Sequence, residues 1–461
     1  MTAASRAPHR VGRQRGYALI LLLAVLGIGV LVLAASATGR TRSGADRDAA
    51  SAAALQHAKQ ALLGYAIGYR DSHPGEVFGY LPLPDLGSSR NPLVPYEGVA
   101  AGNFAGNQKN LSAIGRLPWR TLGVPPIRDG HGECLWYAVS GSHQNVQKTD
   151  TMNWDTIGHF EVFVSDGKPG GVRSLTGSDE HQRPVAVIFS PGPPIVGQNR
   201  QTSSTDDVSE CGGNYDARNY LDPANATAQL NNIVNHFPGA PNNATANVSV
   251  LASPKALIGA PVRDGAAGML VGDSAIVIAS QDIFGAVKRR ADFAAGINAL
   301  LADIANCIAV KGLPAPDTPQ TVGAKLLGGV PASVVGDLST PGSACPATLG
   351  AADRFLRNWR DQFRYAVCSP LTQCMTVNGS ACAGVILFTG ERLGDQRRAS
   401  TSDRVNPANY LEGKNLAAYV QPLPPPYEFA GAPAFSAPND AAMPASQDVA
   451  HCLNTAVSPP Q

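Results

Sequence analysis

The eight cysteines are the residues with the clearest chemistry, and their spacing limits what that chemistry can be. No two of them are separated by just two residues, which argues against a metal ribbon and against a thioredoxin-type redox motif. An even set without that spacing favours disulfides formed in an oxidising compartment. Cys134 with Cys211 and Cys374 with Cys382 are the predicted pairs, because the members of each pair lie in the same part of the chain. Other connectivities stay open, since eight cysteines can pair in many ways.

Side-chain oxygens gather in three short segments. Thr205-Asp206-Asp207 and Ser402-Asp403 could offer ligands to calcium, but neither has an alternating Asp-x-Asp pattern, so solvated turns are expected. Gly272-Asp273-Ser274 lacks the second glycine of a Gly-x-Ser-x-Gly elbow, so a turn at the start of a strand is expected. The histidines lack paired ligand spacing, and no glycine-rich nucleotide loop follows a strand. The sequence therefore predicts no enzyme activity, no metal and no cofactor.

The charge balance limits the partners. The 461 residues include 36 Lys and Arg against 35 Asp and Glu, which gives a formal net charge of +1. This balance excludes a strongly basic nucleic-acid binder and an acidic disordered chain. Glycine (48) and proline (36) are frequent, which is typical of a loop-rich body that contains β-structure.

The N-terminal residues predict how the chain is placed relative to a membrane. No charged residue occurs from Tyr17 to Ala37, and this segment is long enough to cross a bilayer as a helix. A basic flank holds the N-terminus in the cytoplasm and directs the following residues outward. The flanking arginines are Arg6, Arg10, Arg13 and Arg15. The alternative is a secretory signal that is cleaved after Ala35-Ser36-Ala37.

The junction at Gly16 and Tyr17 is more specific than hydropathy. Its residues, Arg13-Gln14-Arg15-Gly16-Tyr17-Ala18-Leu19, resemble the prepilin leader of type IV pilins and type II secretion pseudopilins. The resemblance implies that a prepilin peptidase cuts after Gly16 and methylates the amine of Tyr17. It also implies other pilin or pseudopilin subunits as partners, and a single-pass protein of the inner membrane with its head in the periplasm or, once assembled, in a surface filament. Most pilins carry Glu at the fifth mature position, where this chain has Leu21, which favours a minor or tip-located subunit or a plain anchor.

A helix is predicted to continue from the membrane segment. Apolar residues recur at spacings of three and four between 45 and 69, which is typical of a helix with one buried face. They are Leu55, Ala58, Leu62, Tyr65 and Tyr69. Residues 17–70 are therefore predicted to form one transmembrane and stalk helix. The alternative is a simple anchor followed by a separate Ala-rich helix.

An internal repeat gives the strongest indication of the architecture of the head. In each copy an apolar run, predicted to be a buried strand, ends in a glycine-containing turn before a polar loop returns to an Asn-Tyr-Leu-acid sequence. Tyr137 corresponds to Tyr365, Phe189 to Phe388, Gln198 to Gln396 and Tyr220 to Tyr410. The repeat predicts two small antiparallel sheets that superpose.

The repeated unit also resembles the sheet of the major pseudopilins, in which a D-x-W-G-x-x-x-x-Y segment precedes a strand. Asp129-Gly130-His131-Gly132 with Tyr137 matches it in part, and the second copy keeps Trp359 without a following glycine. The expected fold is therefore α+β: a leader (1–16), the long N-terminal helix, and a loop-rich head with two pilin-like antiparallel sheets. The units are placed at 75–225 and 320–420.

The remaining segments are expected to be a connecting region, a linker and a C-terminal tail. Residues 226–319 are predicted to join the two units through one long helix at 282–310, for which the resemblance to pseudopilins offers no counterpart. Residues 318–347 have the composition of a linker. The Pro-rich tail at 421–461 is predicted to be extended and poorly packed.

These features together predict a non-enzymatic, membrane-anchored minor pilin-like or pseudopilin-like subunit of a type IV pilus or type II secretion apparatus. The alternative is an exported binding protein or adhesin that the N-terminal helix tethers. A secreted hydrolase with an unrecognised site is a third reading. Cleavage at Gly16 separates the first from the second, since the second predicts an intact N-terminus or a cut after Ala37.

Overall fold

The structure is a computed structural model. It describes residues 17–87, 96–102, 112–145, 151–168, 172–175, 179–202, 207–221, 255–258, 262–264, 268–271, 273–345, 347–436 and 448–454. The side chains of the first helix are described from Ser43 onward.

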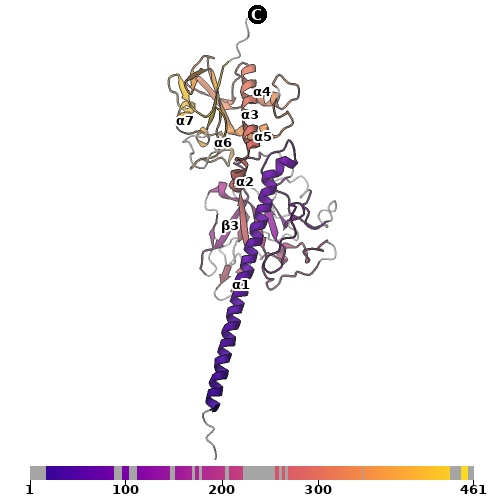
Figure 1. Cartoon of the computed structure of the whole chain (residues 1–461). Helices are drawn as coiled ribbons and strands as arrows, with labels where there is room; N and C mark the ends of the chain where they lie inside the picture. Colours follow the sequence, from indigo (N-terminus) through magenta and orange to yellow (C-terminus); the bar gives the residue numbers. More distant parts are fainter. Residues whose placement is uncertain are drawn as a thin grey trace, which may run out of the picture.

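The chain has a mixed α+β fold with several antiparallel sheets, as predicted (Figure 1). Helix α1 (Tyr17–Ser72) lies beside a four-stranded antiparallel sheet of order β1-β2-β5-β9. Its strands are β1 (Ala113–Arg116), β2 (Trp136–Val139), β5 (Pro184–Ser190) and β9 (Ser274–Ala279). We call this sheet with α1 the first unit.

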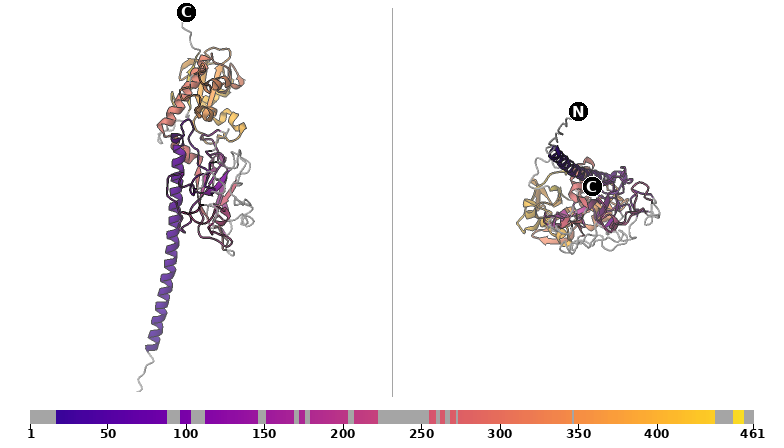
Figure 2. Two further views of the ribbon diagram at one scale, coloured as in Figure 1. Left: turned by 90° about the vertical axis from the view of Figure 1, so that its right-hand side faces the viewer. Right: turned by 90° about the horizontal axis from the view of Figure 1, so that it is seen from below.

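A five-stranded antiparallel sheet of order β10-β11-β12-β15-β17 forms the second unit, together with helix α3 (Ala291–Val310). Its strands are β10 (Asp317–Val322), β11 (Lys325–Gly329), β12 (Phe363–Cys368), β15 (Gly384–Phe388) and β17 (Val449–Leu453). Figures 1 and 2 show the first unit beside α1 and the second unit beyond its C-terminal end.

Shorter elements surround the two main sheets. The helices are α2 (Ser280–Val287), α4 (Ala332–Leu338), α5 (Phe355–Trp359), α6 (Thr401–Val405) and α7 (Gly413–Val420), with 3₁₀ turns η1 (Glu180–Gln182), η2 (Ala217–Asn219), η5 (Arg360–Gln362) and η6 (Pro407–Asn409). The strands are β3 (Phe160–Ser165), β4 (Val172–Ser174), β6 (Lys255–Ile258), β7 (Val262–Asp264), β8 (Gly268–Val271), β13 (Met375–Val377), β14 (Ser380–Cys382) and β16 (Tyr427–Phe429).

One face of α1 is buried against the first sheet. Leu55, Ala58, Leu62 and Tyr69 are buried as the spacing predicts, and Tyr65 is half-buried. The helix contacts β5, β9 and α2. These contacts fix the C-terminal half of α1 on the sheet by burial of an apolar stripe.

Helix α3 covers the second sheet in the same manner, through contacts with β15 and β17. Its sequence Ala299-Leu300-Leu301 repeats Ala61-Leu62-Leu63 of α1, and Leu62, Leu300 and Leu301 are buried in the same core. The helix that was expected to be a connector without a counterpart therefore packs as the core helix of the second unit. The single helix predicted at 282–310 is wrong, because the chain breaks at Lys288–Arg290, where Arg290 is extended and pairs with Asp292.

The segment after each core helix repeats as well. Leu81-Pro82-Leu83-Pro84-Asp85 follows α1, and Leu313-Pro314-Ala315-Pro316-Asp317 follows α3. Each ends in an aspartate that pairs with the neighbouring strand, so close to a glycine of that strand, Gly115 in β1 or Gly328 in β11, that a Cβ on the glycine would overlap the backbone oxygen of Asp85 or Asp317. The two copies therefore share this close approach as well as their sheets.

Strand register corrects one detail of the predicted repeat. Tyr137 pairs with Ile188, and Tyr365 pairs with Ile386, so the two strand pairs are equivalent. Phe189 then corresponds to Leu387 and not to Phe388. The predicted correspondence was one residue off because the two phenylalanines were matched by residue type. The register is instead set by the residue that pairs with the tyrosine.

Two segments, one with the composition of a linker and one expected to pack poorly, are parts of the second unit. The linker-like stretch contains the β10–β11 hairpin and α4. In the tail, β17 is an edge strand of the five-stranded sheet, and Tyr427 and Phe429 in β16 are buried beside β13. The expectation of an extended, poorly packed tail is wrong for these residues, because strand pairing outweighs a proline-rich composition. Residues 437–447 and 455–461 lie outside the described residues.

Candidate functional site

The predicted processing site lies at the start of α1. Gly16 is outside the described residues, and Tyr17 is the first residue of the helix, without a described side chain. Further along α1 the sheet makes a close contact with it. The backbone N–H of Gly130 donates to Oγ of Ser51 (3.0 Å), and a Cβ on Gly130 would overlap the backbone of Arg47. The turn before β2 therefore touches the helix directly at this glycine.

Asp129 in the same segment links the turn before β2 to the end of β5. Its carboxylate accepts hydrogen bonds from the backbone N–H of His131 (2.8 Å) and Glu133 (3.0 Å). It also accepts from Oγ of Ser190 (2.9 Å) and from the N–H of Gly192 (2.9 Å). The aspartate therefore acts as a buried structural acceptor.

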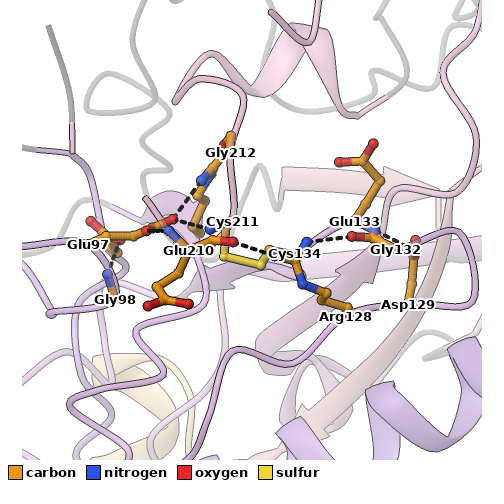
Figure 3. Close-up of a disulfide and its surroundings, with 12 residues drawn as sticks. Glu97, Gly98, Arg128, Asp129, Gly132, Glu133, Cys134, Glu210, Cys211 and Gly212 are labelled. Atoms are coloured by element: carbon orange, nitrogen blue, oxygen red, sulfur yellow. Dashed lines mark hydrogen bonds and ion pairs between the residues drawn. A yellow bond between two sulfur atoms is a disulfide. The ribbon is translucent and has the colours of Figure 1, made fainter. Parts of the chain in front are cut away.

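Cys134 and Cys211 form a disulfide, as predicted (Figure 3). The buried carboxylate of Glu97 lies beside it and accepts hydrogen bonds from the backbone N–H of Glu210 (2.7 Å) and Cys211 (2.8 Å). Arg116 pairs with the same carboxylate (3.2 Å). The disulfide and the glutamate together fix the loop of 207–214 on the first sheet.

The predicted pairing of Cys374 with Cys382 is wrong. Cys374 is bonded to Cys368, and Cys382 is bonded to Cys452. The reason is strand pairing: β17 lies beside β15, so Cys452 comes next to the end of β14, while Cys374 returns toward Cys368 at the end of β12. A fourth disulfide joins Cys307 of α3 to Cys345.

The other chemical candidates have structural roles where they are described. Asp403 forms a capping box with Ser400 at the start of α6, and Asp207 accepts from the backbone of Ser209 (3.2 Å). Thr205 and Asp206 lie outside the described residues. Ser274 is the first residue of β9, as expected of a strand-start turn.

One cluster with metal-ligand chemistry occurs in the described part of the chain, formed by Cys307, Asp337 and Cys345. The two sulfurs are bonded to each other, so they are not thiolates and offer poor metal ligands.

The most elaborate polar arrangement is an arginine clasp that occurs once in each unit. In the first unit the guanidinium of Arg200 donates to the backbone oxygens of Gly192 (2.8 Å) and Asn219 (2.8 Å). It also donates to Oε1 of Gln198 (2.8 Å) and lies over the ring of Tyr220. The clasp therefore ties the loop after β5 to η2.

Arg398 repeats these contacts in the second unit. It donates to the backbone oxygens of Gly390 (2.9 Å) and Asn409 (2.6 Å), to Oε1 of Gln396 (3.0 Å), and lies over the ring of Tyr410. The sequence matched the glutamines and the tyrosines of the two copies but missed the arginines. The shared pattern Gln-x-Arg followed by Asn-Tyr-Leu could have revealed them.

The two clasps differ in their acidic partners. Arg200 pairs with Glu133 of its own unit (3.2 Å), and that carboxylate is partly exposed. Arg398 is fully buried and pairs with Asp155 of the first unit (3.2 Å). The second clasp therefore also joins the units.

A polar junction surrounds Asp155 between the two units. Gln362 donates from Nε2 to Asp155 (2.7 Å) and accepts at Oε1 from the indole N–H of Trp154 (3.1 Å). Asn358 accepts at its side-chain oxygen from the N–H of Met152 (2.7 Å). Direct hydrogen bonds between buried groups hold the units in one relative position.

Burial shifts the pKa values of two titratable groups in the junction. Burial, and then the charge of Asp155, raises the pKa of Asp361 above its usual range. Burial, and then Arg392, lowers the pKa of His181. The neutral ring of His181 accepts at Nε2 from the backbone N–H of Arg398 (3.1 Å). The junction is therefore arranged for structure, with each of these groups satisfied by a specific partner.

Comparison with known proteins gives no relative from which a function could be transferred to this chain. No family model, no curated protein and no solved structure matches the chain.

Proposed function

We propose that the chain is a membrane-anchored, non-enzymatic minor subunit of a type IV pilus or type II secretion apparatus. In this proposal α1 is the assembly helix, and the two units form the head in the periplasm. The observation that carries the proposal is the buried stripe of α1 on an antiparallel sheet, because the same helix continues in sequence into the uncharged segment 17–37 and the prepilin-type junction at Gly16.

The position of the second unit supports a place at the end of an assembly. It lies beyond the C-terminal end of α1, where Arg70 pairs with Asp353 (2.6 Å) and the N–H of Arg354 donates to the backbone oxygen of Gly75 (2.9 Å). A subunit further from the membrane would have to place its own head in the space that the second unit fills. The second unit therefore favours a tip-located subunit, in agreement with Leu21 in place of the usual Glu.

Helix α3 is also long and apolar enough to cross a membrane by composition. It is packed in the core of the second unit, where Phe293, Ile297 and Leu301 are fully buried. The proposal therefore assigns membrane insertion to the N-terminal segment and a core role to α3.

The mass of the intact protein, extracted from membranes, tests the proposal. The expected chain begins at Tyr17 with a methylated amine. Gly16→Phe should keep the leader attached, while Gly12→Phe, a matched change within the leader, should still be processed. A chain that begins at Met1 or at Thr38 would contradict the proposal and would favour a tethered binding protein or adhesin.

A further inference from the structure

The loops that follow β5 and β15 are equivalent residue by residue. Gly192 corresponds to Gly390 and Gln198 to Gln396 with no insertion between them, and the arginine clasp holds both loops in the same way. The loop 391–395 of the second unit lies at the junction. Glu391 pairs with Lys288 (2.6 Å), and Arg392 pairs with Asp179 (2.8 Å).

The equivalent loop of the first unit, 193–197, does not lie on another unit within the described part of the chain. Pro193, Pro194 and Val196 are exposed, and Val196 is the most exposed large apolar residue of the described part of the chain. No charged residue occurs between Ser190 and Asn199. The clasp of Arg200 keeps this apolar tip ordered, so it is presented to the outside as a fixed surface.

We propose that loop 193–197 rests on the distal end of the head of a neighbouring pilin-like subunit, just as loop 391–395 rests on the first unit. The inference rests on the proposed function. Core helices α1 and α3 run in the same general direction in Figure 1, so the two units follow one another along the axis of α1. Repeating that step once more, toward the membrane, places a neighbour beneath the first unit, in a head-to-tail contact.

The chemistry of the loop defines the surface that it fits. In the second unit the equivalent positions are the charged pair Glu391 and Arg392, which meet opposite charges on the first unit. The first unit has Pro193 and Pro194 at these positions, so its partner must offer an uncharged, apolar surface. Rigid proline residues also lose little conformational freedom on binding.

The described residues of a second copy do not repeat the surface on which loop 391–395 lies. The seat on the first unit contains Asp179 and η1, directly before β5. The residues directly before β15 instead form the β13–β14 hairpin, which the disulfide of Cys382 and Cys452 fastens to β17. The distal end of the second unit therefore has a different shape, and the partner is a different chain.

Photocrosslinking in the full-length, membrane-embedded protein tests the inference. The photoreactive residue p-benzoylphenylalanine replaces Val196 in one variant and Val405 in the control. Val405 is also an exposed valine, at the end of α6. We expect an adduct from position 196 only, with a chain whose mature N-terminus shows cleavage of a prepilin-type leader. An adduct with a second copy, an adduct with a protein of another class, or equal yields at 196 and 405 would overturn the inference.

A charge at the same position gives a second readout. Val196→Asp should lower co-purification of the crosslinked partner by about tenfold, because a charge buried in an apolar contact weakens binding by at least about tenfold. Val405→Asp should leave it unchanged, and an equal effect of both variants would speak against the contact. The N-terminus is measured in the same samples: processing at Gly16 without an adduct refutes only this inference, whereas an unprocessed chain refutes the proposed function.

Discussion

Two glycines show how the close approach of a neighbouring backbone limits which side chain a position accepts. Gly115 and Gly328 lie opposite Tyr137 and Tyr365 in the two sheets. We expect Gly115→Ala and Gly328→Ala each to lower the free energy of unfolding by about 1–3 kcal/mol, because the added methyl group overlaps backbone.

The control for the two glycines is Gly336→Ala in α4, where a Cβ meets open space. It should be neutral or stabilising by up to about 1 kcal/mol, since alanine favours the helix. Denaturant unfolding of the extracted protein measures all three changes. A neutral Gly328→Ala would show that the backbone approaches the second glycine less closely than the first.

Asp85 is the residue whose charge should make stability depend on pH. Burial raises its pKa to about 6, although hydrogen bonds from Tyr215, Gly98 and Gly87 act in the opposite direction. Between pH 4 and pH 6 the folded state keeps this proton while the unfolded state loses it, so the contribution of Asp85 to stability falls as pH rises.

The stability of Asp85→Asn relative to the wild type should therefore increase between pH 4 and pH 7, by up to about 3 kcal/mol for a shift of two units. Unfolding at several pH values checks this difference. The control is Asp317→Asn, at the equivalent but exposed position of the second unit. A pH slope that is the same in both variants would rule out burial of Asp85 as its cause.

Disulfides act at the scale of elements, and that of Cys382 and Cys452 holds the edge strand β17. We expect Cys452→Ser to lower the free energy of unfolding by about 2–4 kcal/mol, because the closed loop restricts the unfolded chain. The cut sites of limited proteolysis should move into β17. If proteolysis of this variant stays at the wild-type sites, strand pairing alone holds β17.

Local patterns predict elements well and their partners less well. The spacing of Leu55, Ala58 and Leu62 predicts a helix with one buried face, and the apolar run at 184–190 predicts a buried strand, because both signals lie within a few residues. The partner of Cys382 lies 70 residues away on a strand that the proline-rich composition conceals. Long-range pairing of this kind depends on register, which no local pattern contains.

The duplication was predictable in part at the scale of the whole molecule. Tyrosines and glutamines of the two copies could be matched in the sequence, whereas α3 could not be recognised as the counterpart of α1. The two helices share the short Ala-Leu-Leu sequence at 61–63 and 299–301, and helices can exchange most apolar residues without changing their packing. The repeated Leu-Pro-x-Pro-Asp segments at 81–85 and 313–317 carry the clearer signal, because they lie close against a glycine of the neighbouring strand and tolerate less change.

The two equivalent arginines allow the coupling of the units to be measured. Asp155→Ala leaves the buried guanidinium of Arg398 without its acidic partner. We therefore expect a loss of about 3–5 kcal/mol in the free energy of unfolding. Glu133→Ala removes the partner of Arg200 at a partly exposed site and should cost about 1 kcal/mol or less.

The shape of the unfolding curve distinguishes a junction from an ordinary core contact. If Asp155 couples the units, Asp155→Ala should split one cooperative transition into two, because each unit keeps its own helix and sheet while their shared polar contacts weaken. Glu133→Ala should keep one transition. Equal costs for the two variants, each with a single transition, would mean that apolar packing of Trp154 against Trp359 and Phe388 joins the units without help from the buried ion pair.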